Sequence, residues 1–263
     1  MRDERPIGIF DSGLGGLSVA REVRLRLPGE ALLYLADSAY CPYGGRPLDE
    51  IRDRSVAVTR ALVDAGAKLV VAACNTASGA AIELLRETFD VPIVGLEPAV
   101  KPAANSSRKH RIAVLATPAT LRTDRFNRLV DNHGPGVDVV KVPCPGFVEL
   151  VEAGDVDGEN ALKVIREVLD PVIQADVDRV VLGCTHYPFL RDSVSAVLGE
   201  GVEILDSGAA VARQVERVLR NNDLLSGPGE GGIRIWTTGE PAAVEPVVER
   251  LWGMAISVGR IAT

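Results

Sequence analysis

Apolar residues follow two alternating patterns along this chain. Short runs that are apolar throughout are typical of strands buried on both faces, and longer segments with apolar positions every three or four residues are typical of amphipathic helices. In the first part of the chain the strand-like runs are residues 7–10, 31–36, 69–73 and 92–95. Helical spacing extends from Leu17 to Leu27 and from Ile51 to Ala65, and Gly66 is a suitable stop for the second helix. This alternation predicts βαβ units and a mostly parallel sheet.

The same series then starts again. Strand-like runs recur at residues 111–116, 137–142, 179–183 and 202–205, with helical spacing at 119–130, 160–173 and 188–198. Self-similarity of this kind indicates a duplicated α/β unit, with two parallel sheets whose strand ends can face each other across a central cleft. The expected fold class is therefore α/β, with two similar domains related by a pseudo-twofold duplication.

The last part of the chain adds one more helix, strand and helix. We expect a helix at residues 209–219, a glycine-rich loop at 223–232, a strand at 233–236 and a helix at 242–251. We assign residues 1–97 together with 207–263 to the first domain and residues 98–206 to the second, although the pattern does not say which strand the tail joins. The connections lie near residues 97–107 and 206–208.

Composition narrows the class of partner. A formal net charge of −7 argues against a nucleic-acid partner, since such proteins present a basic face. The charged opening segment leads into a strand-like run, and no stretch of 18 apolar residues occurs, so we expect a cytoplasmic protein that does not enter the membrane. The four cysteines form no C-x-x-C pair and are expected to be free thiols: Cys41, Cys74, Cys144 and Cys184.

Two of these cysteines end near-copies of one passage. One copy is Lys68-Leu-Val-Val-Ala-Ala-Cys74-Asn75-Thr76, and the other is Asp178-Arg-Val-Val-Leu-Gly-Cys184-Thr185-His186. Ligands of open α/β sheets bind outside the carboxyl ends of the strands, where both thiols are expected. Inverting a carbon that bears an acidic hydrogen needs one group to remove a proton from one face and another to deliver one to the opposite face. A pair of thiols can do both, so the passages predict two-base racemisation.

Several alternatives compete with this interpretation. Either cysteine can be an inert buried residue, and Cys184 with His186 can ligate a metal, although a chain with three histidines and no paired spacing does not favour a metal site. The glycine-rich segment that starts at Asp11 could open a dinucleotide site, but the fingerprint needs glycine where Ser18 stands. Amino-acid racemisation with pyridoxal phosphate needs a lysine in the site, and none of the five lysines lies near such a strand end. We therefore expect no cofactor.

Three further side chains are candidates for proton transfer. His186 can tune the thiol two residues before it, or it can be a satisfied core histidine. Asp11 can play the matching role for Cys74, cap the first helix, or do both. Glu152 follows an apolar run where a carboxylate is unexpected, and the alternative is a solvated helix face.

With these residues identified, the chain resembles bacterial glutamate racemases of the aspartate/glutamate racemase superfamily over nearly its whole length. The matching motifs are Gly8-Ile-Phe-Asp11-Ser12-Gly-Leu-Gly-Gly16, Asp37-Ser-Ala-Tyr-Cys-Pro-Tyr43-Gly44, Ala73-Cys74-Asn75-Thr76-Ala77, Thr117-Pro-Ala-Thr120, Pro143-Cys-Pro-Gly-Phe-Val-Glu-Leu-Val-Glu152 and Gly183-Cys184-Thr185-His186-Tyr187-Pro188.

The resemblance implies cofactor-independent interconversion of L- and D-glutamate, which supplies D-glutamate for peptidoglycan, by an enzyme that often pairs as a homodimer. It implies that Cys74 acts on the D enantiomer with help from Asp11, and that Cys184 acts on the L enantiomer with help from Glu152 and His186. The implied substrate contacts are Asp11, Ser12, Tyr43, Gly44, Asn75, Thr76, Thr117, Thr120, Thr185 and His186.

Two other functions stay open at this point. The same thiol pair would serve an aspartate racemase or another amino-acid racemase of this superfamily. Two α/β lobes around a cleft would also suit a protein that only binds an amino acid, although such proteins usually work outside the cytoplasm, where this chain is not expected.

Overall fold

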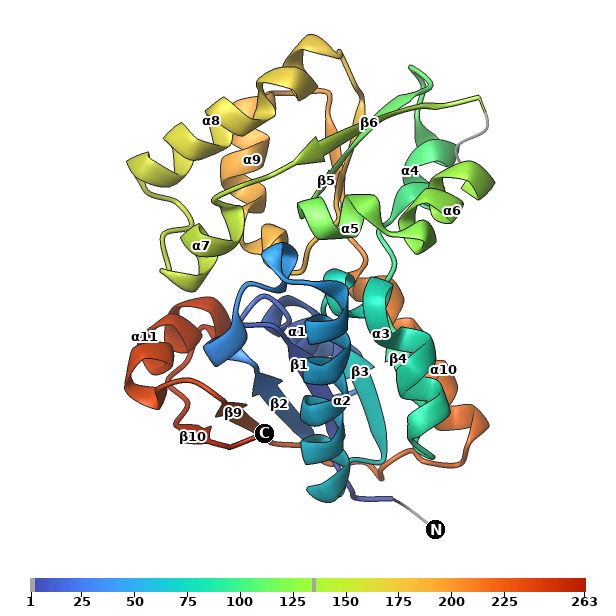
Figure 1. Ribbon diagram of the computed structural model, residues 1–263, viewed down its shortest axis with the longest axis vertical. Coiled ribbons are helices and arrows are strands. Elements are labelled where there is room, and N and C mark those ends of the chain that lie inside the picture. Colours follow the sequence, from blue (N-terminus) through green and yellow to red (C-terminus); the bar gives the residue numbers. More distant parts are fainter. Residues whose placement is uncertain (1–2, 134–135) are drawn as a thin grey trace.

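The computed structural model describes residues 3–133 and 136–263, and it contains two parallel sheets flanked by helices (Figure 1). The first sheet has six strands in the spatial order β10 (Val258–Arg260), β9 (Ile233–Thr237), β2 (Leu32–Ala36), β1 (Ile7–Asp11), β3 (Leu69–Ala72) and β4 (Ile93–Gly95). The second has four strands in the order β6 (Asp138–Pro143), β5 (Arg111–Ala116), β7 (Arg179–Leu182) and β8 (Glu203–Leu205). Every pairing between neighbouring strands is parallel.

The two sheets repeat one strand order. In the first, β2, β1, β3 and β4 are consecutive neighbours, and in the second β6, β5, β7 and β8 occupy the equivalent places. The duplication expected from the sequence is therefore confirmed, with β5 as the counterpart of β1 and β7 as the counterpart of β3. Because equivalent strands have equivalent carboxyl ends, the two sheets carry matching positions for functional side chains.

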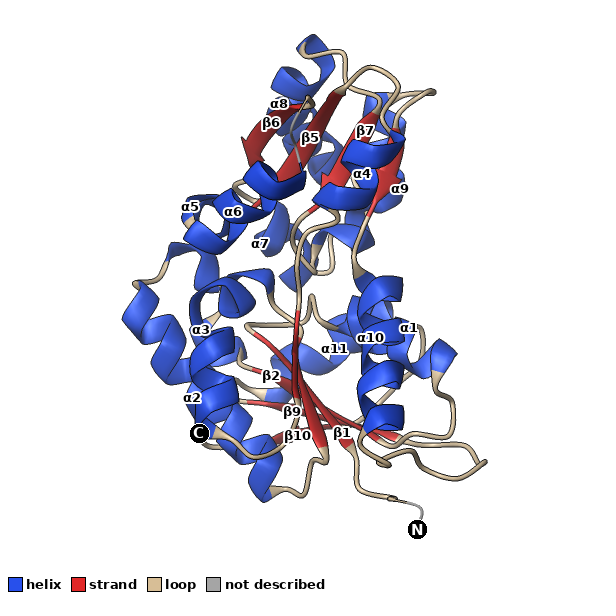
Figure 2. Ribbon diagram, turned by 90° about the vertical axis from the view of Figure 1, so that its right-hand side faces the viewer, coloured by secondary structure: helices blue, strands red, loops and turns tan. Residues whose placement is uncertain are grey.

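Helices cover both faces of each sheet, as the edge-on view shows (Figure 2). The helices around the first sheet are α1 (Leu17–Arg26), α2 (Leu48–Asp64), α3 (Asn75–Thr88), α10 (Gly208–Asn221) and α11 (Pro241–Trp252). Those of the second are α4 (Val100–Ser106), α5 (Pro118–Arg122), α6 (Asp124–His133), α7 (Phe147–Glu152), α8 (Glu159–Gln174) and α9 (Arg191–Leu198). Single 3-10 turns occur at η1 (Ser38–Tyr40), η2 (Tyr43–Gly45) and η3 (Tyr187–Leu190). Among the described residues, no helix combines the length and the apolar character needed to cross a membrane.

The apolar strands face two cores at once. Ile7 and Ile9 of β1 belong to the core on the side of α1 and α10, whereas Phe10 belongs to the core on the side of α2 and α3. Successive strand residues point to opposite faces, so a sheet covered on both sides needs apolar residues throughout. The first of these cores continues into the second sheet through residues such as Leu115 and Leu182. The two halves therefore pack directly on each other.

The structure differs from the sequence-based expectation in a few short elements. The helical segment expected at residues 119–130 is two helices, because Thr123 is extended and its hydroxyl accepts a hydrogen bond from the N–H of Phe126 at 3.2 Å, which caps α6. The connection at residues 97–107 contains helix α4, and the segment at 188–198 begins with the 3-10 turn η3 before α9. The tail adds two strands to the first sheet, where β9 pairs with β2 and β10 pairs with β9.

Candidate active site

Cys74 and Cys184 occupy equivalent places in the two halves. Each follows the last residue of its strand, β3 or β7, by two positions, and the side chains are only 5% and 8% exposed. The strand ends face each other, since the hydroxyl of Thr185 donates to the carboxylate of Asp11, the last residue of β1, at 3.4 Å. Charge on Cys184 is also one of the causes that raise the pKa of Cys74.

The surroundings of Cys74 come mainly from the first half. Its sulfur caps helix α3 by accepting the N–H of Ala77 at 3.5 Å, and it lies 4.0 Å from the hydroxyl oxygen of Ser12. Burial and then the negative charge of Asp11 raise the pKa of Cys74 above its ordinary value, and the bond from Ala77 offsets only part of this. The thiol form is therefore favoured in this arrangement.

Asp11 is held at the start of the glycine-rich loop. Its carboxylate accepts the N–H groups of Ser12 at 2.8 Å and Gly16 at 2.7 Å, just before helix α1 begins. The strict N-cap position belongs to Gly16, so Asp11 binds the loop rather than capping the helix. Burial raises the pKa of this carboxyl group above its usual range, although charge on His186 and the N–H of Gly16 oppose the effect. A fully buried carboxylate of this kind can exchange a proton with its neighbours.

Glu152, the last residue of α7, forms a close pair with His186. One carboxylate oxygen lies 2.6 Å from Nε2 of His186 and accepts the N–H of Leu14 at 2.6 Å. The N–H of Gly15 also approaches Nε2, at 3.2 Å, but the much shorter carboxylate contact indicates that Nε2 carries a proton and donates to Glu152. The solvated helix face considered for Glu152 is thus wrong, whereas Glu149, one turn earlier, is exposed.

The charges of this pair support each other. Burial alone would disfavour the imidazolium, but hydrogen bonds to Cys184, Cys41 and Glu152 outweigh it and raise the pKa of His186 well above its ordinary value. Burial likewise opposes the ionised form of Glu152, yet the hydrogen bond and charge of His186 lower the pKa of Glu152 overall. Nδ1 of the same ring lies 3.7 Å from the sulfur of Cys184 and 3.9 Å from Asp11. The imidazole therefore links Glu152 to one thiol and lies beside Asp11, whose charge raises the pKa of the other.

Glycines allow the loop to approach these groups so closely. A Cβ atom at Gly13 would lie 2.2 Å from Oε1 of Glu152, and one at Gly15 would lie 2.2 Å from Nδ1 of His186. Neither position tolerates a side chain without displacement of the pair. The close approach lets the N–H of Leu14 in this loop donate to the carboxylate of Glu152.

The predicted threonines form a second polar group at the same place between the sheets. The hydroxyl of Thr76, at the start of α3, lies 3.1 Å from that of Thr117 and 3.3 Å from that of Thr120. Gly44 packs against Thr117, since a Cβ at Gly44 would lie 3.0 Å from it. The buried Oδ1 of Asn75 accepts no hydrogen bond from the residues that the structure describes.

Two residues of the Asp37 to Gly44 motif behave unexpectedly. The phenol of Tyr43 is buried and donates to Asp37 at 2.5 Å. Cys41, which sequence reasoning treated only as a free thiol, lies beside Glu152 and His186, with the three possible ligand atoms within 4.8 Å of one another. Burial raises the pKa of Cys41 to about 11. Its place in the same motif as Tyr43 was the signal that could have identified it.

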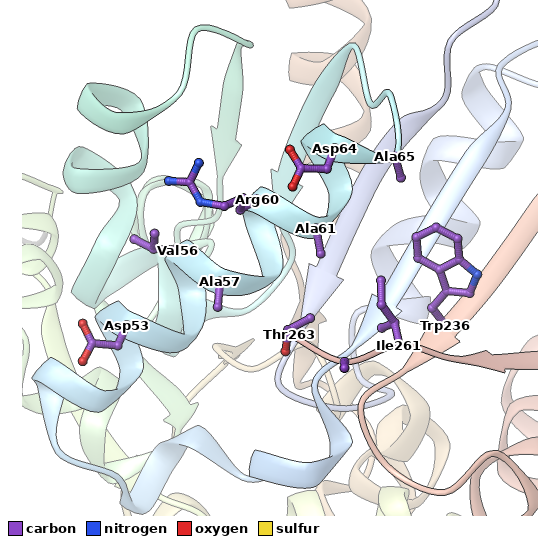
Figure 3. Close-up of a pocket in the computed structure, with 11 residues that line it drawn as sticks. Asp53, Val56, Ala57, Arg60, Ala61, Asp64, Ala65, Trp236, Ile261 and Thr263 are labelled. Carbon is purple, nitrogen blue, oxygen red and sulfur yellow. The ribbon is translucent and has the colours of Figure 1, made fainter.

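An open surface cavity lies elsewhere, between α2 and the C-terminal segment (Figure 3). Side chains of α2, such as Val56 and Arg60, line it together with Trp236 and Ile261. None of the predicted site residues contributes to it. The chemistry suggested by the sequence is therefore located in the closed region between the sheets.

Comparison with known proteins agrees with this geometry. Residues 17–215 match the family model described as Asp/Glu/Hydantoin racemase. The chain belongs to this family. It is 45% identical over 260 residues, 98% of both chains, to the glutamate racemase of Pseudomonas paraeruginosa, and 46% identical over 92% of its length, and 95% of the relative, to that of Herpetosiphon aurantiacus.

Solved structures of the family superpose on nearly the whole chain. The glutamate racemase isoform RacE1 of Bacillus anthracis has a TM-score of 0.90 at 31% identity, covering 99% of this chain and 98% of its own. The glutamate racemase of Thermus thermophilus, solved with β-chloro-D-alanine, has a TM-score of 0.83 at 39% identity and covers 98% and 97%. The two-domain α/β fold class expected from the sequence is thus confirmed, and the chain is a member of an amino-acid racemase family.

Proposed function

We propose that this chain interconverts L- and D-glutamate without a cofactor, with Cys74 and Cys184 as the two proton-transfer groups. The observation that carries the proposal is the placement of two thiols at equivalent strand ends of two facing, duplicated sheets. Relatives at about 45% identity over nearly the full length are glutamate racemases, which supports glutamate as the substrate.

The reaction then runs as two coupled proton transfers. From D-glutamate, Cys74 passes its thiol proton to the carboxylate of Asp11, and the resulting thiolate takes the α-proton. The electron pair of the C–H bond passes to the α-carbon and its carboxylate. The thiol of Cys184 gives its proton to the opposite face of that carbon, which produces L-glutamate and a thiolate at Cys184. The reverse reaction uses the same groups in opposite order, and proton exchange restores the starting thiol.

Neighbouring groups would assist each thiol. Asp11, whose charge acts on Cys74, would help that sulfur gain and lose its proton. The Glu152–His186 pair would serve Cys184 through Nδ1, which lies 3.7 Å from the sulfur. General acid–base assistance of this kind contributes on the order of 10²–10⁴ in rate.

The remaining polar residues would hold the substrate. Free to accept a hydrogen bond, Oδ1 of Asn75 suits the substrate ammonium group. The carboxylates of the substrate would be bound by the backbone at Tyr43 and Gly44 and by five side-chain hydroxyls. These belong to Ser12, Thr76, Thr117, Thr120 and Thr185.

Both thiols are buried, so the substrate needs a route to them. We propose that residues 1–97 with 207–263 form one domain, that residues 98–206 form the other, and that glutamate enters when they separate. The membership of the strands supports this division, since β5 to β8 alone make the second sheet. A lid-like movement of this type also excludes water from the reacting carbon.

The wider setting follows from the same proposal. D-glutamate would serve peptidoglycan synthesis, and thiol chemistry suits the reducing cytoplasm, where cysteines stay free. By resemblance to the family, the enzyme would work as a homodimer, which light scattering of the purified protein would test.

Two experiments test the proposal: incorporation of deuterium from the solvent, and substitution of each of the two cysteines. The wild-type chain should incorporate deuterium from heavy water at the α-carbon of both glutamate enantiomers, whereas a protein that only binds glutamate would incorporate none. Cys74→Ser and Cys184→Ser should each lower racemisation, followed by circular dichroism, by on the order of 10²–10⁴. Cys144→Ser is the control, because this buried thiol lies outside the two repeated passages and its sulfur bonds the carbonyl oxygen of Val142 at 3.4 Å; the charge of Cys184 acts on its pKa, and serine keeps the same donor there. Near-normal turnover by either active-site variant would refute the two-base scheme.

The alternative substrate is tested in the same assay. L- and D-aspartate should racemise far more slowly than glutamate. Faster turnover of aspartate would assign the chain to the other branch of the family.

A further inference from the structure

Cys41 places a third thiol beside the paired acid and imidazole. It lies in the short connection between η1 and η2, and its side chain is partly exposed. Cys41, Glu152 and His186 each offer one atom that can ligate a metal, and these atoms all lie within 4.8 Å of one another. The proposed racemisation gives Cys41 no task, so its position calls for a separate explanation.

The three donors are those that zinc prefers. Zn²⁺ takes thiolate, imidazole and carboxylate ligands in a tetrahedron, with bonds of about 2.0–2.3 Å, so that neighbouring ligand atoms are roughly 3.3–3.7 Å apart. The distances between the three ligand atoms depart from this range by about 1 Å or less. The 2.6 Å contact between Glu152 and His186 must widen, and the longest distance, at most 4.8 Å, must shorten. Small side-chain movements can achieve both changes. A fourth position would stay open for water.

The surroundings also favour a cation. Asp11 lies 3.9 Å from the imidazole of His186, and the thiol of Cys184 lies 3.7 Å from it. The backbone of Gly13 comes close to two of the three ligands, because a Cβ there would lie 2.2 Å from Glu152 and 2.8 Å from the sulfur of Cys41. Acidic groups and thiols therefore surround the three ligand atoms, where a small ion would replace protons.

We infer that Cys41, Glu152 and His186 form an inhibitory site for one borderline-soft divalent cation of the Zn²⁺ class. Binding would exchange the thiol proton of Cys41 and the Nε2 proton of His186 for the metal, and both protons would pass to solvent. The imidazole could then no longer move protons between Glu152 and Cys184, so racemisation would stop. The inhibitory effect rests on the function proposed above, whereas the binding itself does not.

Direct metal binding tests the site independently of activity. The full-length metal-free chain is titrated with Co²⁺, which reports a coordinated thiolate by its charge-transfer absorption, and Zn²⁺ affinity is then measured by competition with a chromogenic chelator. Wild type should bind one equivalent with a thiolate signal. Cys41→Ser should weaken Zn²⁺ binding by on the order of 100-fold or more, at least the loss seen when a supporting residue of a metal site is removed. Cys144→Ser, the buried control thiol, should bind as wild type does.

Activity is then compared within each protein, relative to its own rate without metal. Zn²⁺ should inhibit wild type and Cys144→Ser at concentrations that leave Cys41→Ser active, while Mg²⁺, which prefers oxygen ligands, should not inhibit. Should Cys41→Ser fail to fold, Glu152→Gln provides the second binding test and should also lose affinity. Undiminished affinity and thiolate absorption in Cys41→Ser would overturn the inference, because the metal would then lie on Cys74 or Cys184. A chain that binds Co²⁺ through Cys41 but does not racemise glutamate would refute the proposed function and leave the metal site standing.

Discussion

Replacing Glu152 by glutamine removes one charge from the active site and little else. In the wild type the N–H of Leu14 donates to the carboxylate of Glu152 at 2.6 Å, and the amide oxygen of glutamine can still accept this bond. The negative partner of His186, 2.6 Å from Nε2, is lost. Since that partner helps to raise the pKa of His186, we expect the imidazole of the variant to be neutral more often at neutral pH.

Two magnitudes follow for this variant. If the pair assists proton transfer at Cys184, kcat/KM should fall by about 100-fold or more, the lower end of what a positioned acid–base group contributes. The free energy of unfolding should fall by roughly 1–3 kcal/mol at neutral pH, as for other charged hydrogen bonds. The lowered pKa of Glu152 means that wild type has this stability above the unfolded-state pKa and loses it as the pH falls through the folded-state pKa. The stability difference between the two proteins should therefore shrink in acid.

The direction of the reaction gives the sharpest readout. The two enantiomers have equal free energy, so kcat/KM must stay equal in both directions in every variant. Isotope effects are not bound by this equality. With α-deuterated glutamate, Glu152→Gln should show a larger primary effect from the L side, where Cys184 is proposed to remove deuterium, and a smaller one from the D side, where Cys74 is proposed to do so.

Glu149→Gln is the matched control, because it makes the same substitution one turn earlier in the same helix, at an exposed side chain. It should leave the rate and both isotope effects at wild-type values. The assignment of the Glu152–His186 pair to Cys184 would be refuted by two results together. Glu152→Gln would keep a rate within about twofold of wild type, a change far smaller than the effect of an acid–base group, and its isotope effects would be unchanged in both directions.

Two other substitutions test the frame around the site. Gly13→Ala should lower kcat/KM by about 100-fold, because the new Cβ would lie 2.2 Å from Oε1 of Glu152 and displace it. Gly45→Ala is the control and should match wild type, because a Cβ there would meet no atom within 4 Å. Equal rates for the two variants would contradict the packing argument. Lys68→Met breaks a buried ion pair of 2.6 Å with Glu30 and should cost about 3–5 kcal/mol in urea denaturation. Adding Glu30→Met should restore part of that loss, and no recovery in the double variant would mean that the charge is not the cause.

The duplicated fold was predictable because burial on both faces leaves a simple signal. Strands covered by helices on both sides must be apolar along their whole length, and eight such runs could be identified in two matching series. The same argument predicted thiols at strand ends, since Cys74 and Cys184 follow equivalent runs. Local pattern was sufficient here, because each strand is flanked by helices close in sequence.

Short elements and distant pairings left no comparable signal. Strand β10 has only three residues, and α4 has only two turns, with Pro98 before it and Pro102 within it. The apolar pattern of such short elements does not differ from that of the neighbouring loops. The pairing of β9 with β2 joins segments about two hundred residues apart, which periodicity cannot report. The break at Thr123 depends on the capping ability of one hydroxyl inside a helical pattern.

The site was predictable in its residue types and less so in their contacts. The sequence left Glu152 between a solvated face and a functional role, because its partner His186 lies on another element and only folding brings them to 2.6 Å. The sequence placed Tyr43 at the substrate but did not show that its phenol donates to Asp37, which leaves the backbone of this residue as the proposed contact. Cys41 was overlooked because it lies outside the two repeated passages, and only its place in the Asp37 to Gly44 motif pointed to it.

The duplication explains the pair of thiols but not their helpers. His186 follows Cys184 by two positions, while the equivalent residue after Cys74 is Thr76; in the same way Asp11 ends β1 and Thr117 follows its counterpart β5. The first copy therefore carries a carboxylate and the second an imidazole, and the two groups lie 3.9 Å apart. Because the proposed reaction links enantiomers of equal energy, this asymmetry cannot favour either product. It can only decide which of the two proton transfers is slower, and this is why isotope effects measured from both sides are the observation that the fold makes most informative.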